Sequence, residues 1–501
     1  MVRRRLAPRR ATREQYVYSW IGTGVVTVIA AILRLIGLDH PKGKIFDETY
    51  YATEGWGLIN HGVEWNEKDN TAAYVVHPPL GKWAIGLGEW IFGYDEFGWR
   101  ISAVVAGVLS VLILTRIARL MFNSTVLGCA AGLLMALDGM HFVMSRSALL
   151  DIFLMFFVLA AFGALVLDRD AKRRRWLRAL EDGLDPSLRG RAGRIPWSRD
   201  AVPWWRLLAA VLLGCAIGVK WSAVFFVPAF ALLVLFWEWG ARRSAGVRRP
   251  LVDTLLEEFG WLLLCGVLIA GVYLATWTGW FLSDDGFYRH WLHDYRNEPE
   301  PPVIGALQNL LHYHEEALNF HRKLTSSHTY KSWPWQWLLL ARPVAFYWSG
   351  SGSCGASSCA SEVLLLGTPV LWWSFLPALG ALTWLGIARR DWRAWTIWTG
   401  VAAGLLPWFY FAEQGRTMFY FYALPAEPFL ILAVVYVLGA IMSPPRRTAP
   451  DDTRRLIGAI VAGAYVLLVA ACFAYFYPIY VGETITYAEW SKRMFLDSRW
   501  I

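Results

Sequence analysis

Long apolar stretches alternate with short polar segments along most of the chain. The stretches long enough to cross about 30 Å of hydrocarbon lie at residues 17–37, 98–120, 125–142, 148–167, 205–237, 256–280, 363–388, 394–411, 417–440 and 456–477. The stretch 205–237 is too long for one crossing, and Lys220 interrupts it. Because a charge in mid-membrane is costly, we predict two shorter helices that turn at Lys220. The pattern therefore predicts about eleven transmembrane helices.

Composition supports the same fold class. Hydrophobic residues make up 56% of the 501 residues and charged residues only 17%, with a mean hydropathy of +0.36. A water-soluble surface cannot be assembled from so few polar residues. The chain is therefore predicted to be an all-α polytopic membrane protein.

Basic clusters set the predicted orientation, because Lys and Arg near span ends accumulate on the cytoplasmic side. With about eleven crossings the following clusters fall on one side: Arg3-Arg4-Arg5, Arg9-Arg10, Lys172 to Arg175, Arg242-Arg243, Arg248-Arg249, Arg389-Arg390, Arg446-Arg447 and Arg454-Arg455. The net charge of +9 then describes a cytoplasmic collar facing anionic lipid, and we expect no nucleic-acid partner.

This orientation divides the chain into five regions. The regions are a basic cytoplasmic N-terminus (1–16), a first set of helices (17–280) with an outer loop (38–97), a second outer loop (281–362), a second set of helices (363–477) and an outer C-terminal tail (478–501). The first span is read as an uncleaved signal anchor. Cytoplasmic residues 168–203 are interpreted as a linker with little core of its own.

Cysteine and histidine positions raise two questions about the outer loops. Cys354 and Cys359 lie in a Gly/Ser-rich outer stretch, where their spacing allows a disulfide without demanding one. His312, His314 and His321 could form a metal site, but they lack an accompanying carboxylate or Cys set. We favour an amphipathic helix over residues 303–318, lying on the membrane surface, and expect no metal.

Two adjacent carboxylates, Asp47 and Glu48, follow the first span by about ten residues. About thirty residues further on comes the sequence HPPLGK, which carries His77 and Lys82. Of these groups, a carboxylate can remove a proton from a hydroxyl, and a basic turn can stabilise the charge of a nearby leaving group. The ordinary alternative is an acidic pair that only solvates a loop.

Charged residues also gather at the outer ends of the spans: Arg34, Arg100, Arg146, Asp151, Lys220 and Arg416. A single interfacial Lys or Arg is usually a snorkelling anchor. A group of cations on the side of Asp47 and Glu48 is better explained by a phosphate held at the membrane surface.

Several motifs in order resemble the protein O-mannosyltransferase family. They run from about Arg34 to Pro425: Arg34-Leu35-Ile36, Phe46-Asp47-Glu48, His77 to Lys82, Arg100, Ser145-Arg146 through Asp151, Val219-Lys220-Trp221, Asn319-Phe320-His321, His328-Thr329-Tyr330 and Trp333-Pro334-Trp335. The pattern is similar to actinobacterial members, which lack the extra β-trefoil domain. Residues 420–425 depart from the His-containing run of many eukaryotic members, so no role is assigned there.

The resemblance implies a GT-C architecture with its active site on the outer face of the plasma membrane. It implies inverting transfer of mannose from a polyprenyl-phosphate donor to Ser/Thr hydroxyls of secreted proteins, with Asp47 as base and Glu48 orienting the acceptor or sugar. Lys220 and Arg416 are the first candidates for the donor phosphate. The remaining implied contacts are Lys82, Arg34, Arg100, Arg146 and His77 on the donor side and His321, His328 and Trp333 on the acceptor or loop side.

The resemblance implies no obligatory cofactor and leaves open both a divalent cation and contact with the translocation machinery. Two alternatives stay in view. A related GT-C enzyme could move another sugar, such as arabinose or aminoarabinose, from the same kind of lipid. A transporter or flippase would also carry charges within the membrane, but we find no inverted repeat, and the candidate residues lie on one face.

Overall fold

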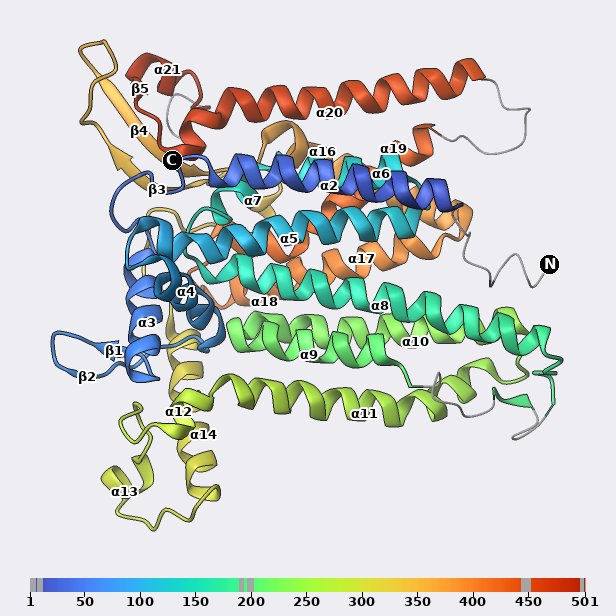
Figure 1. Cartoon of the computed structure of the whole chain (residues 1–501), viewed down its shortest axis with the longest axis horizontal. Helices are drawn as coiled ribbons and strands as arrows, with labels where there is room; N and C mark the ends of the chain where they lie inside the picture. The colour runs from blue at the N-terminus through green and yellow to red at the C-terminus, as the bar shows by residue number, and fades with distance from the viewer. Residues whose placement is uncertain are drawn as a thin grey trace.

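The computed structural model of the chain describes residues 6, 12–188, 193–195, 202–442, 452–495 and 500. Its long helices lie side by side along one axis, and shorter elements gather at the end that carries the C-terminus (Figure 1). The basic clusters at residues 3–5, 9–10 and 446–447 lie outside the described residues.

Eight helical segments of the described chain are long and apolar enough to cross a membrane. They are Arg13–Leu35 (α2), Glu96–Phe122 (α5), Leu150–Glu181 (α8), Trp221–Ala245 (η3 and α10), Pro250–Thr276 (α11), Pro369–Arg389 (α16), Tyr420–Met442 (η4 and α19) and Arg455–Val481 (in α20, Asp452–Val481). Two shorter apolar helices are Thr125–Ala136 (α6) and Trp204–Val219 (α9). The predicted stretch 394–411 forms α17 (Trp392–Leu405) and α18 (Pro407–Glu413). The total of about eleven crossings stays a prediction.

Polar side chains cap the starts of three apolar helices, α2, α5 and α6. Thr12 and Gln15 form a capping box at the start of α2, and the Asp95 side chain accepts a hydrogen bond from the Gly98 amide at the start of α5. Ser124 does the same for α6. Such caps satisfy amide groups that have no partner within the helix, and the helix starts therefore follow from the local sequence.

The predicted break at Lys220 is confirmed. Helix α9 ends at Val219, Lys220 has an extended backbone, and the chain resumes as the short η3 (Trp221–Phe225) and then α10 (Phe226–Ala245). Close packing of α9 against α11 depends on glycine, since a Cβ at Gly218 would lie 2.6 Å from the Thr276 side chain. Lys220 is thereby placed between the end of α9 and the start of η3.

The core of the bundle is centred on α8 and the η4–α19 segment. In each of these, 78% of the most apolar window is buried, against 22% in α2 and 6% in α11. Helix α11 packs on α9 along one side and has few fully buried residues, so the rest of its apolar surface faces outward, as in a lipid-facing helix at the edge of the bundle.

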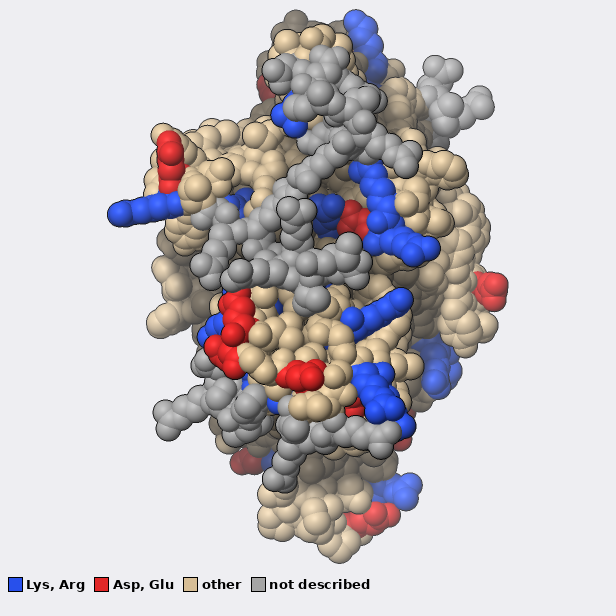
Figure 2. Space-filling model, turned by 90° about the vertical axis from the view of Figure 1, so that its right-hand side faces the viewer, with Lys and Arg blue, Asp and Glu red and all other residues tan. Residues whose placement is uncertain are grey.

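The end of the bundle that carries the start of α2 holds basic clusters such as Lys172 to Arg175 and Arg242-Arg243, and Figure 2, which faces this end, shows Lys and Arg side chains over the surface with patches of Asp and Glu among them. The interpretation of residues 168–203 as a linker with little core is corrected over their first part. Helix α8 continues to Glu181, and Trp176 is buried in a small cluster with Leu6, Ala241 and Ala245. The many Arg residues around Trp176 hid the helical spacing of the apolar residues in these last turns, so the sequence did not predict that they pack.

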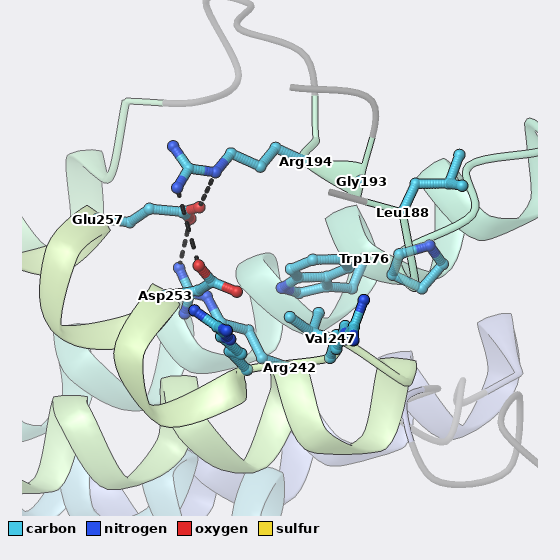
Figure 3. A pocket seen from close by; sticks show the side chains of 11 residues that line it. Trp176, Leu188, Gly193, Arg194, Arg242, Val247, Asp253 and Glu257 are labelled. Atoms are coloured by element: carbon cyan, nitrogen blue, oxygen red, sulfur yellow. Dashed lines mark hydrogen bonds and ion pairs between the residues drawn. The ribbon is translucent and has the colours of Figure 1, made fainter. Parts of the chain in front are cut away.

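Buried ion pairs tie α8, α9, α10 and α11 together at this basic end. Arg206 contacts Asp168 (2.8 Å), Glu238 (3.3 Å) and Glu258. A pocket beside this network is lined by Arg194, Arg242, Asp253 and Glu257, whose charges pair with one another (Figure 3). Because these charges already compensate one another, the network holds helices together.

The opposite end carries both predicted outer loops (Figure 1). The first loop contains α3 (Glu48–His61), β1 (Trp65–Asn66), β2 (Thr71–Ala72) and α4 (Leu80–Phe92). The second contains α13 (Trp291–Arg296), α14 (Ile304–Lys323), α15 (Pro334–Trp337), β3 (Val344–Ser349) and β4 (Cys359–Leu365), and α12 (Thr278–Leu282) and α7 (Gly139–Met144) lie nearby. The expected helix over residues 303–318 is confirmed as α14.

A small antiparallel sheet joins the second loop to the C-terminal tail. Strand β3 pairs with β4, with Val344 opposite Leu365, and β4 pairs with β5 (Ile485–Thr486), with Cys359 opposite Thr486. The tail continues into α21 (Tyr487–Ser491). Cys354 and Cys359 form a disulfide, so the bond that the sequence left open is present. The sheet was not predicted, since all-α architecture was expected throughout.

Candidate active site

Asp47 immediately precedes α3 and carries an unusually unconstrained carboxylate. Its side chain makes no capping bond, and no hydrogen bond to it is found within the described part of the chain. Burial raises its pKa from 3.8 to about 6, with Asp151 and Glu54 acting in the same direction and Lys220 against them. A half-buried carboxylate with free lone pairs and this pKa is suited to accept a proton near neutral pH.

The backbone before Asp47 is held in a strained conformation. Phe46 has a positive φ of 45°, which costs energy for a side chain of this size. Its ring stacks on Phe346 from β3, with centroids 4.5 Å apart, and meets Phe421 edge-on. These contacts fix the turn and so fix where Asp47 points.

Glu48 lies in a different environment from its neighbour. It is fully buried, and Arg100 from α5 donates to both of its oxygens, from Nε and Nη2, at 2.9 Å each. The amides of Ile45 and Ala148 donate to the same carboxylate at 3.0 Å. Arg100 also donates to the carbonyls of the loop after α2, those of Leu38, Pro41 and Gly43. This pair therefore holds the loop and α5 together.

The arginines near the end of α2 also serve backbone carbonyls. Arg34 is fully buried and donates to the carbonyls of Ala30 and Ala136, with its Nη2 2.7 Å from His141 Nδ1. Arg146 donates to the carbonyls of Arg34 (2.7 Å), Ile36 (2.7 Å) and Gly37 (2.6 Å). Both side chains order the segment that leads to Asp47.

The charge of Lys82, in α4, is compensated by ion pairs with two carboxylates. Its ammonium is fully buried, contacts Glu64 and Glu54 (3.4 Å to the latter), and donates to the His77 carbonyl at 2.9 Å. The two carboxylates share one cation, and burial raises the pKa of Glu54. This cluster joins α3, α4 and the turn that carries His77.

Lys220 and Asp151 form a charged pair whose two charges act on Asp47. The Lys220 ammonium lies 3.0 Å and 2.9 Å from the two Asp151 oxygens and 4.8 Å from the centre of the Tyr422 ring. A small pocket beside them is lined by Asp151, Lys220, Ser222, Trp408 and Tyr422, among others. Helix ends α8, α9 and η4 thus bring three polar groups to one cavity.

Arg416 approaches the same place from the segment before η4. Its Nε donates to the His321 carbonyl at 3.2 Å, and its guanidinium lies 5.8 Å from the Tyr422 ring centre and 5.7 Å from that of Trp408. In the described residues no carboxylate lies within ion-pair distance of it. Arg34 and Arg146 each donate to two or three carbonyls, whereas Arg416 donates to one and keeps further guanidinium donors for an anion.

Two histidines complete the surroundings. The rings of His77 and His321 lie 5.1 Å apart, and burial together with nearby Lys220 keeps the pKa of His77 well below its usual range. Burial lowers the pKa of His321 to about 4. His321 Nε2 donates to the Val76 carbonyl at 3.0 Å, and its Nδ1 is a buried acceptor without a partner among the described residues. Both rings are neutral hydrogen-bonding groups.

The remaining candidates lie further out. His328 is exposed and meets Phe419 edge-on at 4.9 Å, and Trp333 stacks on Trp335 at 5.6 Å. His312 stacks on Trp291 at 3.8 Å, whereas His314 contacts the Tyr273 hydroxyl. Within the described residues, no group of three His, Cys, Asp or Glu side chains is placed to hold a metal ion.

Two family models match the chain: dolichyl-phosphate-mannose-protein mannosyltransferase over residues 24–181 and the C-terminal four-helix transmembrane region of protein O-mannosyltransferase over residues 306–500. Polyprenol-phosphate-mannose--protein mannosyltransferase of Mycobacterium tuberculosis is 41% identical, over 96% of this chain and 91% of that protein. The Mycolicibacterium smegmatis protein of that name is 39% identical over 96% and 92%. The chain belongs to the protein O-mannosyltransferase family.

A solved structure agrees at the level of the fold. The Saccharomyces cerevisiae protein O-mannosyltransferase Pmt1-Pmt2 complex bound to the sugar donor aligns with a TM-score of 0.70 at 15% identity, over 95% of this chain and 91% of that one. This mannosyltransferase therefore has the GT-C fold, as the motifs implied.

Sequence reasoning on this mannosyltransferase missed the partners of its cations. Glu54 and Glu64, which neutralise Lys82, were not singled out, and neither was Tyr422, whose ring faces both Lys220 and Arg416. Asp151 was noted only as a charged span end. The available signal was the Tyr-rich run before Pro425, since aromatic rings near a predicted phosphate site can hold a cation.

Proposed function

We propose that this protein transfers mannose from a polyprenyl-phosphate-mannose donor to Ser or Thr hydroxyls of secreted proteins, with inversion at the anomeric carbon. The observation that carries the proposal is the uncompensated carboxylate of Asp47 beside the Lys220–Asp151 pair, with the free cation of Arg416 nearby. The names of the mycobacterial relatives supply the sugar and the class of acceptor.

The reaction needs one base and one phosphate site. Asp47 takes the hydroxyl proton as the acceptor oxygen bonds to the anomeric carbon, and the bond from that carbon to the phosphate oxygen breaks with its electron pair going to the lipid phosphate. Attack from the face opposite the phosphate inverts the configuration. Proton removal of this kind contributes about 10² to 10⁴ in rate.

Lys220 and Arg416 meet the phosphate. Lys220 shares its charge with Asp151, and Tyr422 lies against both cations. Arg416 supplies the charge that Lys220 alone does not, and a guanidinium holds phosphate oxygens through paired hydrogen bonds. Cations that already stand in place stabilise the charge that develops on the leaving group.

Neutral histidines are suited to hydroxyl groups of the sugar or the acceptor. The buried Nδ1 of His321 has no partner among the described residues and can accept a hydrogen bond from such a hydroxyl, and His77 lies beside it. His328 and Trp333, at the exposed rim, contact the acceptor chain in this proposal. Glu48, Arg100, Arg34, Arg146 and Lys82 act as positioning residues, because their charges are spent on buried pairs and carbonyls.

The proposal places the active site on the extracytoplasmic face of the cell membrane. The basic end of the bundle lies opposite the end that carries α3 (Figure 1), which Asp47 immediately precedes, and Lys and Arg concentrate on the cytoplasmic side. Acceptors are then met outside, where contact with the translocation exit is feasible. No obligatory metal is included, since protein cations face the phosphate.

The test is transfer of radiolabelled mannose from purified polyprenyl-phosphate mannose to a Ser/Thr-rich peptide by the purified protein. We expect label on the peptide that β-elimination releases as mannose. Label from polyprenyl-phosphate arabinose in place of mannose would assign another sugar. If the protein moved polyprenyl-phosphate mannose across the vesicle membrane without any transfer of mannose, it would be a flippase and the proposed activity would be wrong.

A further inference from the structure

Helix α14 (Ile304–Lys323) stands apart from the bundle at the end that carries Asp47. It runs across the direction of the long helices and extends past the outer side of α11 (Figure 1). Because only 6% of the residues in the apolar window of α11 are buried, its side away from α9 faces lipid, and α14 therefore extends over the membrane beside the protein. The helix has twenty residues, too many to be a simple turn between elements.

One side of α14 is bound to the protein. Asn309, Leu310, Tyr313 and Ala317 are buried there. Two hydrogen bonds hold the Tyr313 hydroxyl: it donates to the Val75 carbonyl at 2.8 Å and accepts from the Val75 amide at 3.0 Å. The Asn309 side chain accepts from the Leu292 amide at 2.9 Å. The helix is thus held at a defined rotation about its own axis.

A second side is apolar and uncovered. Ile304 (61% exposed), Leu307 (43%), Leu311 (61%) and Leu318 (39%) recur at i, i+3, i+7 and i+14, so they form one stripe along the helix. Exposed polar side chains, those of Gln308, Glu315 and Asn319, adjoin this stripe, rotated from it by about 70° about the helix axis. A helix with protein, apolar and polar sides is the arrangement expected where protein, lipid and water meet.

The apolar stripe continues a surface that already faces lipid. Leu282, in α12 between α11 and α14, is 81% exposed, so exposed apolar side chains lead from the edge of the bundle to α14. A row of leucines in water would be costly. The outer-leaflet interface fits this row, since amphipathic helices bury such a stripe at the boundary of headgroups and acyl chains.

The inner end of α14 reaches the active site. The carbonyl of His321 accepts from Arg416 Nε at 3.2 Å, and the next residues pair with the same segment, the Thr417 amide donating to the Leu324 carbonyl at 2.8 Å. Arg416 leads directly into η4, which carries Tyr422. The position of α14 therefore sets the position of Arg416.

We propose that α14 docks in the outer leaflet through Ile304, Leu307, Leu311 and Leu318, and that this docking holds Arg416 and His321 over the site of Asp47. The docking is independent of the activity, whereas its effect on Arg416 rests on the proposed function. The occupant of the stripe is lipid, and the class of partner is a phospholipid surface.

Site-directed fluorescence tests the docking without any catalytic readout. Cys129, Cys215, Cys265 and Cys472 are replaced by Ala, and the Cys354–Cys359 disulfide is kept. Leu311→Cys on the apolar side and Gln308→Cys on the polar side are each labelled with an environment-sensitive dye. The proteins are reconstituted in phosphatidylcholine/phosphatidylglycerol vesicles, some of which contain nitroxide-labelled lipid.

Dye at position 311 should be quenched by nitroxide lipid at least about twofold more than dye at position 308, and aqueous iodide should show the reverse order. Equal access of iodide to both positions would refute docking. Protection of position 311 from both quenchers would assign the stripe to a protein partner, such as a second copy.

A second measurement tests the effect on Arg416. The double variant Leu307→Gln, Leu311→Gln should raise KM for the lipid donor in vesicles by at least about threefold, whereas Gln308→Ser should leave it unchanged. Lipid quenching at Leu318→Cys in the double-variant background reports whether docking is lost. If docking is lost and KM stays unchanged, the position of α14 does not affect the donor site, and the proposed effect on Arg416 is wrong. Docking without transfer by the parent protein would leave this inference standing and remove the proposed function.

Discussion

Replacing Asp47 by Asn should abolish activity and make the protein more stable, an outcome that distinguishes a catalytic carboxylate from a structural one. The Asp47 side chain is half-buried and makes no capping bond. Its charge is therefore held in an unfavourable place, and the isosteric amide removes that charge while keeping the shape. We expect transfer to fall by at least about 10², because the amide cannot accept the proton.

The gain in stability follows from the pKa. The pKa of Asp47 is raised from its ordinary value of 3.8 to about 6, and each tenfold change in proton affinity corresponds to a free energy of ~1.4 kcal/mol. The ionised carboxylate therefore costs about 3 kcal/mol at pH 7 and above as an upper figure. The raised pKa also fixes the sign: the cost is present above pH 6, shrinks as the pH falls through about 6, and vanishes below 3.8.

Thermal unfolding of the detergent-purified protein, followed by tryptophan fluorescence at pH 8, 7, 6 and 5, measures this difference. Asp47→Asn should unfold at a higher temperature than the parent at pH 8, and the gap should close at lower pH. The matched control is the neighbouring Glu48→Gln, which leaves the buried Arg100 charge uncompensated and should cost about 3–5 kcal/mol. If Asp47→Asn is destabilised like Glu48→Gln, or retains full transfer, the reasoning is refuted.

Three further outcomes are expected. The rate of transfer should rise with pH and level off above about 6, because the base is the ionised form of Asp47; a pH profile flat down to pH 4 would contradict this. Lys220→Met, which keeps the apolar stem, should weaken donor binding and slow transfer together, and unchanged kinetics would make Lys220 a snorkelling anchor. Single cysteines at Lys68 and Ser327 should react with an impermeant maleimide in intact cells, and one at Ser187 only after the membrane is opened; protection of Ser327 would reverse the topology.

Much of the bundle could be predicted because its signal is local. Hydrophobic stretches and caps depend on neighbouring residues, and the break at Lys220 followed from the cost of one charge in an apolar run. The extension of α8 to Glu181 escaped prediction because its few apolar residues there, Trp176, Leu177 and Leu180, stand among arginines and pack in a cluster with residues of α10. The small sheet escaped for the related reason that β4 and β5 are separated by more than a hundred residues.

The candidate site shows the same division. The sequence identified which charged residues gather at one end, but it could not tell which of them pair. Glu48 meets Arg100 across 52 residues, and Lys220 meets Asp151 across 69. A cation such as Arg34 looks the same in sequence whether it faces a phosphate or the carbonyl of Ala136. Only the arrangement in space separates Arg416, which donates to one carbonyl, from Arg34 and Arg146, which donate to two or three carbonyls of the chain they hold.

The pairing pattern also explains why the reaction can use one of two adjacent carboxylates and not the other. During transfer the lipid phosphate gains one negative charge as it leaves, and the base loses one as it takes the proton. If the base is Asp47, the total charge near Lys220 and Arg416 stays constant, so no buried charge is created. If Glu48 took the proton, Arg100 would lose its counter-charge, and four hydrogen bonds to the carboxylate would be weakened within a fully buried cluster. Asp47 is thus the carboxylate whose protonation leaves the surrounding fold unchanged.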